Sequence, residues 1–149
     1  RPASRGEVLL RTADPLDAPA FVPNYLQDPQ DVQATLAGLR ILRNILATEP
    51  MASRIVSELV PGPQVRTDEQ LIDFMRREGH CSYHPAGTCK MGIDDAAVVD
   101  PELRVRGIDR LRVMDSSICP TLSSSNTNIP TIAIAEKGAD LLLAAAANA

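Results

Sequence analysis

The sequence predicts a mixed α+β fold in which an antiparallel sheet packs with helices. Apolar residues recur at intervals of three and four in residues 29–49, 68–79 and 129–147, which is the period of helices that bury one face. Alternating apolar and polar residues predict short strands near the N-terminus and within residues 98–113. With 149 residues, 44% of them hydrophobic, the chain is long enough to bury one core, so residues 1–149 are expected to form a single domain.

The N-terminal half is expected to be mainly a helical scaffold. Residues 7–11 alternate as a strand does and lead into a proline-rich extended loop. Asp28-Pro29 then supplies a cap and a first-turn proline for the first long helix. Residues 51–59 predict a second, shorter helix that buries its apolar side chains, and the capping-box pattern of Thr67 to Gln70 begins a third.

Strands and turns are expected to follow from His80 onward. Residues 103–105 should pair with residues 111–113 in a hairpin. The last helix should begin at an Asn128 cap, with Pro130 inside its first turn. Its buried face is expected to include Ile132, Ala135, Ala139, Leu142 and Leu143.

Charge and composition exclude several classes of partner. The net charge is −4 and no run of lysine or arginine occurs, which argues against nucleic acid and anionic membranes. No apolar run approaches the roughly 20 residues of a transmembrane helix. Three cysteines, an odd number, fit free thiols in a reducing compartment and predict a cytoplasmic location. Because the chain starts at Arg1 without methionine and enters a strand at once, we expect it to be part of a longer protein.

Chemistry is most strongly indicated in residues 80–91, which contain both histidines of the chain. The spacing of Cys81, His84 and Cys89 matches no usual zinc pattern, so no metal site is expected. The sequence contains no G-x-S-x-G elbow, no P-loop and no G-x-G pair. From the residues alone, His84 is either a lone base or a structural histidine. Asn126 and Asn128 lie before a helix, where asparagines more often act as caps and turn formers than as catalysts.

Four ordered blocks of sequence bear on the choice between a catalytic and a structural role for His84. They are HPAGTCKMG at 84–92, VDPELRV at 99–105, LRVMDSSI at 111–118 and NTNIPT at 126–131. Together they resemble the C-terminal part of the glucose-methanol-choline (GMC) oxidoreductases, nearest to the choline dehydrogenase and long-chain alcohol dehydrogenase branch. The resemblance implies that residues 1–149 are the substrate-binding and catalytic domain, without the FAD-binding N-terminal part.

What the resemblance implies is an FAD enzyme that oxidises an alcohol to an aldehyde, with hydride passing to the flavin and the hydroxyl proton to a base. His84 matches the active-site histidine of the family, and Asn126 matches a position that holds asparagine or a second histidine. Neutral imidazole suits the base near pH 7, and an amide N–H at Asn126 suits the developing alkoxide. The positions that match segments along the flavin are Asp115, Ser116, Asn128, Pro130 and Thr131. A turn or cap role for Asp115 stays open beside this one.

Two functional classes follow for the chain. The first is the catalytic part of a flavin alcohol dehydrogenase, which needs the FAD domain of its parent and a small alcohol, such as choline or an aliphatic primary alcohol. The second is a separately folding substrate-recognition or interaction module without activity of its own. The isolated chain should lack FAD and turnover, and the apolar run 141–147 predicts self-association. His84 and Asn126 should converge to within roughly 6 Å at the edge of the sheet.

Overall fold

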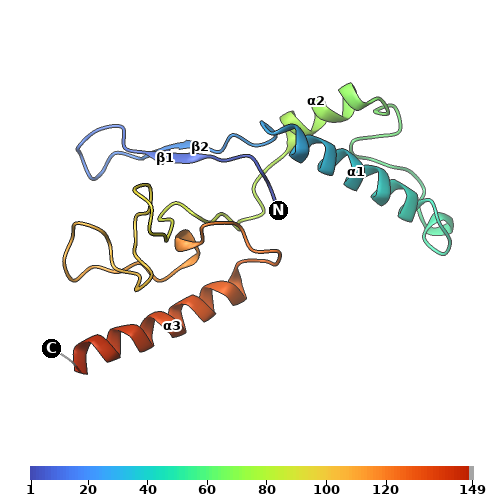
Figure 1. Cartoon of the computed structure of the whole chain (residues 1–149). Coiled ribbons are helices and arrows are strands. Elements are labelled where there is room, and N and C mark those ends of the chain that lie inside the picture. Colours follow the sequence, from blue (N-terminus) through green and yellow to red (C-terminus); the bar gives the residue numbers. More distant parts are fainter. Residues whose placement is uncertain (148–149) are drawn as a thin grey trace. The chain divides into compact units, whose positions relative to one another are not determined.

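The computed structural model describes residues 1–147, which fall into two compact units. One unit comprises residues 2–80, and the other comprises the residues from 81 onward together with Arg1. Each unit has its own helices (Figure 1) and its own cluster of buried hydrophobic residues. Within residues 1–147, no helix combines the length and the hydropathy needed to cross a bilayer.

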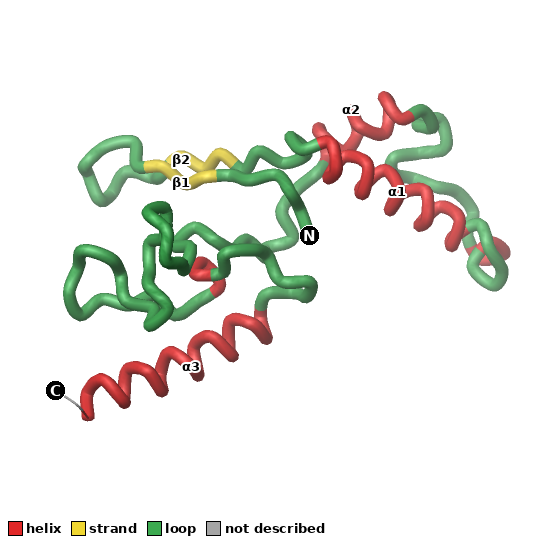
Figure 2. Tube along the Cα trace, viewed as in Figure 1, coloured by secondary structure: helices red, strands yellow, loops and turns green. Residues whose placement is uncertain are grey.

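The first unit begins with a two-stranded antiparallel sheet. Strand β1 (Glu7–Leu9) pairs with β2 (Ala20–Val22) (Figure 2). In this pairing, Glu7 lies opposite Val22 and Leu9 opposite Ala20. The first strand lies where the sequence predicts it, but β2 lies in the stretch expected to be an extended loop. That expectation was wrong because β2 is only three residues long, between two prolines that are tolerated at the ends of an edge strand.

Two capped helices form the core of this unit. Helix α1 (Pro29–Leu46) starts after Asp28, whose side chain accepts a hydrogen bond from the N–H of Gln30. Helix α2 (Asp68–Glu78) starts with the predicted capping box, in which Thr67 and Gln70 bond each other's backbone. The residues buried between the helices are Val32, Leu36, Leu71 and Met75. These apolar faces confirm the helical periodicity of the sequence.

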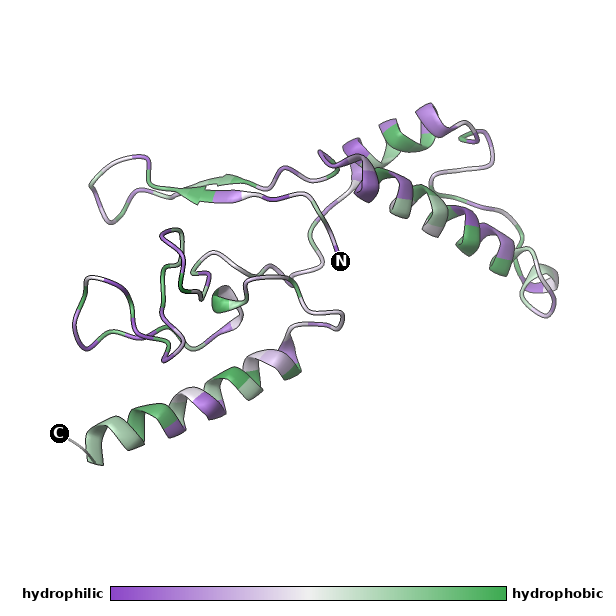
Figure 3. Ribbon diagram, in the orientation of Figure 1, coloured by the Kyte–Doolittle hydropathy of each residue, from purple (hydrophilic) through white to green (hydrophobic). Residues whose placement is uncertain are grey.

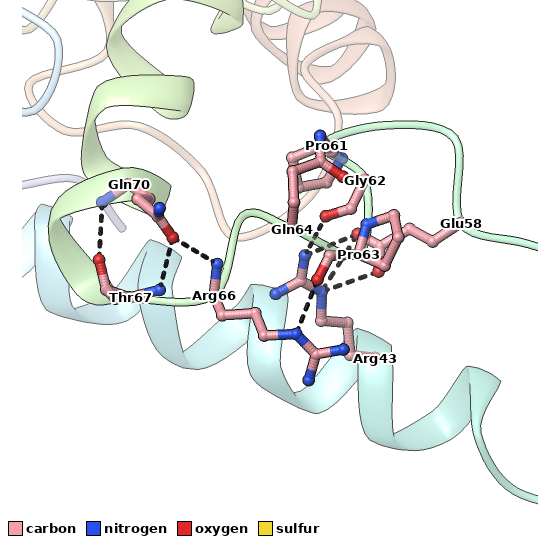
Figure 4. Close-up of polar contacts among 9 residues, drawn as sticks. All are labelled: Arg43, Glu58, Pro61, Gly62, Pro63, Gln64, Arg66, Thr67 and Gln70. Carbon is pink, nitrogen blue, oxygen red and sulfur yellow. Dashed lines mark hydrogen bonds and ion pairs between the residues drawn. The ribbon is translucent and has the colours of Figure 1, made fainter.

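The second predicted helix, residues 51–59, is largely absent. Only a single 3₁₀ turn forms, η1 (Ala52–Arg54), and Val56 beyond it is fully exposed. The guanidinium of Arg43 on α1 donates to the carboxylate of Glu58 at 2.7 Å and to the carbonyl of Gly62 at 3.3 Å (Figure 4). These bonds connect residues 58–62 to α1. Residues 55–59 are not helical, so their apolar side chains do not lie on one helical face.

An acidic residue at the start of α1 anchors the N-terminal strand segment. The carboxylate of Asp31 accepts the N–H groups of Ala3 and Ser4, both at 2.7 Å. A hydrogen bond from the Ser4 side chain, with those two backbone bonds, holds the pKa of Asp31 below its usual value. The charged carboxylate therefore fastens residues 3 and 4 to the helix.

This anchor predicts a pH-dependent contribution to stability. Because the folded pKa of Asp31 lies below the unfolded value, its contribution is full above about pH 4 and is lost as pH falls through the folded pKa. Asp31→Asn should therefore show a smaller loss of unfolding free energy between about pH 5 and pH 2 than the wild type. Asp73→Asn is the control, since its ion pair with Arg77 is exposed on both sides. Equal pH dependence of Asp31→Asn and the wild type in denaturant unfolding would contradict the anchor.

In the second unit, isolated bridges replace most of the predicted strands. Among the described residues from 81 onward, pairing is limited to single bridges, one of which joins Arg104 to Arg112 in the predicted hairpin. The carboxylate of Asp100 accepts the N–H groups of Glu102 and Arg104, and Leu103 takes a left-handed φ of +65°. Burial raises the pKa of Asp100, but bonds from Arg104 outweigh it and hold the pKa below the usual value. This tight turn interrupts the strand before a regular ladder can form.

Helix α3 (Asn128–Ala147) packs on this irregular segment through a different face from the one expected. The core residues Val99, Leu103 and Ile118 contact Ile134 and Leu141 of the helix. Gly138, midway between these two, is buried, whereas Ile132, Leu142 and Leu143 are exposed. The periodicity of α3 was misleading because hydrophobic residues occur along most of its length (Figure 3), so the sequence pattern does not single out one face.

Gly138 allows α3 to approach Met114 closely. A Cβ atom at Gly138 would lie 2.6 Å from the sulfur of Met114 and 3.2 Å from its Cβ. At Gly38 in the middle of α1, a Cβ would meet no other atom of the described chain within 4 Å. The two glycines therefore share a helical setting and differ in their surroundings.

Alanine at these two positions should have opposite effects. Gly38→Ala should raise the unfolding free energy by about 0.5–1 kcal/mol, the usual gain in helix propensity. Gly138→Ala should be less stable than Gly38→Ala by about 1–3 kcal/mol, the typical cost of overpacking. Both values come from denaturant unfolding. Met114→Ala removes the sulfur and Cγ but keeps the Cβ at 3.2 Å, so combining each change with Met114→Ala should remove most of the difference. A difference that stays undiminished would mean that the Met114 contact is not its cause.

Candidate active site

The segment that begins with His84 is fastened to η2 (Ser116–Ile118) by backbone hydrogen bonds. The N–H groups of Gly87, Cys89 and Met91 donate to three successive carbonyls, those of residues 116, 117 and 118, at 3.3, 2.9 and 2.8 Å. The hydroxyl of Ser116 donates to the carbonyl of Pro85 at 3.3 Å. The resemblance placed His84 and Ser116 in one site, and the structure brings their segments side by side.

A glycine is required within this ladder of backbone hydrogen bonds between residues 87–91 and 116–118. Gly87 has a φ of +90°, which other residues rarely adopt, and a Cβ there would lie 3.1 Å from the carbonyl oxygen of Cys119. Tyr83, on the other side of His84, also has a positive φ, +63°, and its side chain is exposed. The backbone therefore turns sharply on both sides of His84, which places the histidine on a loop rather than on a strand.

His84 itself contacts the residue that precedes α3. Its Nδ1 lies 3.0 Å from the hydroxyl oxygen of Thr127 and 3.4 Å from the backbone nitrogen of the same residue. The ring is half-buried. Asn126 precedes Thr127 in the chain and its side chain is exposed. The segments of His84 and Asn126 thus meet, but they meet between two loops and not at the edge of a sheet, because no strand lies within residues 81–147.

The start of α3 differs by one residue from the sequence prediction. Thr127, rather than Asn128, is the capping position, because its carbonyl accepts the N–H and the hydroxyl of Thr131 at 2.9 and 2.7 Å. Asn128 is the first helical residue and is exposed, and Pro130 lies in the first turn as expected. Thr127 was missed as a site residue. A threonine directly before a helix is the available signal, but it indicates only a cap.

The contacts of Asp115 are those of a cap. Its carboxylate accepts the N–H and the hydroxyl of Ser117 at 2.8 and 2.5 Å, which begins η2. Asp115 therefore has the cap role that the sequence left open. A role in binding a cofactor would be additional to this structural one. Among residues 1–147, no three His, Cys, Asp or Glu side chains are grouped closely enough to hold a metal ion.

Comparison with known proteins identifies the class. The family model for the C-terminal part of GMC oxidoreductases matches residues 2–135. The chain is 46% identical to the alcohol dehydrogenase (acceptor) of Pseudomonas putida, over 95% of this chain and 26% of that protein. It is 43% identical to the mitochondrial choline dehydrogenase of Homo sapiens, over 95% of this chain and 24% of that protein. These relatives and the fold define the C-terminal part of an oxidoreductase.

Solved structures agree with the sequence comparison. Pyridoxine 4-oxidase from Mesorbium loti matches with a TM-score of 0.85 at 35% identity, over 93% of this chain and 27% of that one. A formate oxidase of Aspergillus oryzae, studied for modification of its FAD, matches with a TM-score of 0.88 at 31% identity, over 97% of this chain and 26% of that one. The chain belongs to the GMC oxidoreductase family, and it spans about a quarter of the length of the relatives it matches.

Proposed function

We propose that this chain is the catalytic C-terminal part of an FAD-dependent enzyme that oxidises an alcohol to an aldehyde, with His84 as the base. The observation that carries the proposal is the orientation of the imidazole. Among the hydrogen bonds of the described residues, both contacts of His84 are made by Nδ1. Nε2 is therefore available to a substrate, and the half-buried ring is held in place from its other side.

The reaction needs a base because an alcohol is a very weak acid. As the C–H bond of the carbinol carbon breaks, Nε2 of His84 takes the hydroxyl proton, which lets the carbonyl double bond form. Asn126, exposed beside the contact with His84, donates an amide N–H to the same oxygen and orients the substrate. FAD, when bound, supplies the acceptor for the hydride.

The donors around His84 fit a flavin. The isoalloxazine ring presents carbonyl oxygens and ring nitrogens that accept hydrogen bonds, and it gains negative charge on reduction. The exposed side chains of Asn126 and Asn128 are neutral donors, and the start of the 20-residue helix α3 carries the positive end of a helix dipole. The residues proposed to hold the cofactor are Asp115, Ser116, Asn128, Pro130 and Thr131.

The proposed partners are the FAD domain of the parent protein and a small alcohol. The names of the relatives favour choline or an aliphatic primary alcohol as the substrate. Exposed apolar residues on α3, including Ile129, Ile132 and Leu143, support the prediction that the isolated chain associates with itself. A cytoplasmic location remains a proposal that rests on cysteine usage.

Anaerobic mixing of the full-length protein with choline and with primary alcohols tests the function. Loss of the oxidised flavin absorbance with one of these substrates is the expected result. The 149-residue chain alone is expected to show neither flavin absorbance nor turnover. A flavin-loaded full-length protein that no alcohol reduces would contradict the function and favour a recognition module without chemistry.

A further inference from the structure

We propose that the loop of residues 104–112 binds a phosphate group, as inorganic phosphate or a phosphate monoester. Together with Asp100, this loop lines a cavity of about 410 Å³. The lining includes four arginines and two aspartates, so it carries a net charge of +2 in a chain whose net charge is −4. These charged residues are Asp100, Arg104, Arg106, Asp109, Arg110 and Arg112. The inference is independent of the chemistry proposed for His84.

Two of the four arginines face each other across the hairpin. Arg104 and Arg112 are partners in an antiparallel bridge. Backbone hydrogen bonds of 2.9 and 3.1 Å flank this bridge on its two sides, so the two arginines form a closely spaced pair that has no backbone hydrogen bond of its own. Like charges directly opposite each other destabilise such a pairing. An anion bound between the segments offsets that cost.

The charge of Arg104 is already compensated within the loop. Its guanidinium pairs with the carboxylate of Asp100 at 2.7 Å and with that of Glu102 at 3.2 Å. The hydrogen bond to Asp100 and the charge of that carboxylate hold the pKa of Arg104 above its usual value. The positive charge of the cavity therefore comes from the other three arginines.

These three arginines have no carboxylate partner among residues 1–147. The guanidinium of Arg106 donates to two backbone carbonyls, at 2.8 and 3.0 Å, and that of Arg112 donates to the carbonyl of Glu102. Carbonyl oxygens accept hydrogen bonds but do not neutralise a charge. Arg110 is exposed, and its side chain makes no hydrogen bond within the described part of the chain. Three guanidinium charges at one cavity are therefore available to an anion.

The placement of these charges favours a phosphate over a carboxylate. Arg106 precedes the turn at Gly107, whereas Arg110 and Arg112 follow it. A carboxylate offers two oxygens in one plane and a single charge, but a phosphate offers three acceptor oxygens and a charge of about −1.5 to −2. Guanidinium groups bind phosphate through paired N–H donors. A Cβ at Gly107 would meet no atom beyond its neighbouring residues within 4 Å, so the turn leaves space for a ligand.

Equilibrium dialysis of the full-length protein against labelled inorganic phosphate, at constant ionic strength, tests the site. Saturable binding to the wild type is expected. Arg110→Gln should weaken it at least about 10-fold, the usual contribution of a hydrogen bond to a charged group. Because the Arg110 side chain bonds no other described residue, the fold should be unaffected. Arg54→Gln removes the same charge from the exposed turn η1, and it should bind phosphate as the wild type does.

A second variant should change the affinity in the opposite direction. Asp109 is the acidic residue of the lining that does not pair with an arginine in the described chain. Asp109→Asn should therefore strengthen binding by up to about 5-fold, the size of a surface charge interaction. Acetate at the same ionic strength should not displace the phosphate. Absence of saturable binding to the wild type would overturn the proposal, as would equal affinities of Arg110→Gln and Arg54→Gln.

Discussion

Replacing His84 with alanine in the full-length protein is expected to slow flavin reduction by an alcohol about 100-fold or more, the usual size of a general-base effect. The substitution removes the acceptor of the hydroxyl proton but leaves the ladder that holds the segment, because that ladder is made by backbone groups of residues 87–91 and 116–118. FAD should therefore remain bound. The measurement is the rate of flavin bleaching after anaerobic mixing with substrate.

His80→Ala is the matched control for this experiment. The His80 ring is exposed, and its Nδ1 lies 3.2 Å from the carbonyl oxygen of Glu78, so its loss should leave the reduction rate unchanged. Asn126→Ala should act on the same step with a smaller loss than His84→Ala. Normal reduction in His84→Ala would make the histidine structural, and the proposed role of Asn126 would then lose its basis.

Leu36→Ala is expected to lower the unfolding free energy by about 2–5 kcal/mol, as large-to-small substitutions in a core do. Leu36 is 0% exposed and packs in a cluster with Val32, Leu71 and Met75 between α1 and α2. The truncation leaves a cavity among the three other buried residues of the cluster and the partly buried side chains that pack against it, Leu26, Leu39, Val65, Ile72 and Phe74. Denaturant unfolding followed by the helical circular dichroism signal measures the loss.

Leu42→Ala provides the comparison within the same helix. Leu42 is 51% exposed, so alanine there removes little buried surface and has a similar helix propensity. We expect a change below about 1 kcal/mol. Similar losses at Leu36 and Leu42 would mean that α1 is not held by the cluster described here.

Local sequence signals predicted the starts of α1 and α2 correctly. The Asp28 cap and the box of Thr67 and Gln70 act within one turn of helix, so the sequence alone specifies α1 and α2. Residues 51–59 were predicted wrongly because Arg43 holds Glu58, 15 residues away. The interface of α3 was also missed, since a buried glycine contributes to packing without appearing in a hydrophobic pattern.

The candidate site was predictable in part. Residues 84–92 and 126–131 drew attention through their resemblance to a family, and the structure places the two segments in contact. The contact between Thr127 and His84 was not predictable, since the two residues lie 43 positions apart in the sequence. Local sequence indicates only a helix cap at that position.

The ladder between residues 87–91 and 116–118 also bears on which genetic changes this loop tolerates. Because backbone groups make these bonds, the identity of an exposed side chain such as Thr88 does not enter them. Insertion or deletion of a single residue between His84 and Gly87 would instead change the distance along the chain from the ladder to the imidazole and displace His84 from Thr127. Exposed side chains of the loop such as that of Thr88 should therefore tolerate substitution, whereas Gly87 is fixed by its positive φ and the length of the loop is constrained by the placement of one imidazole.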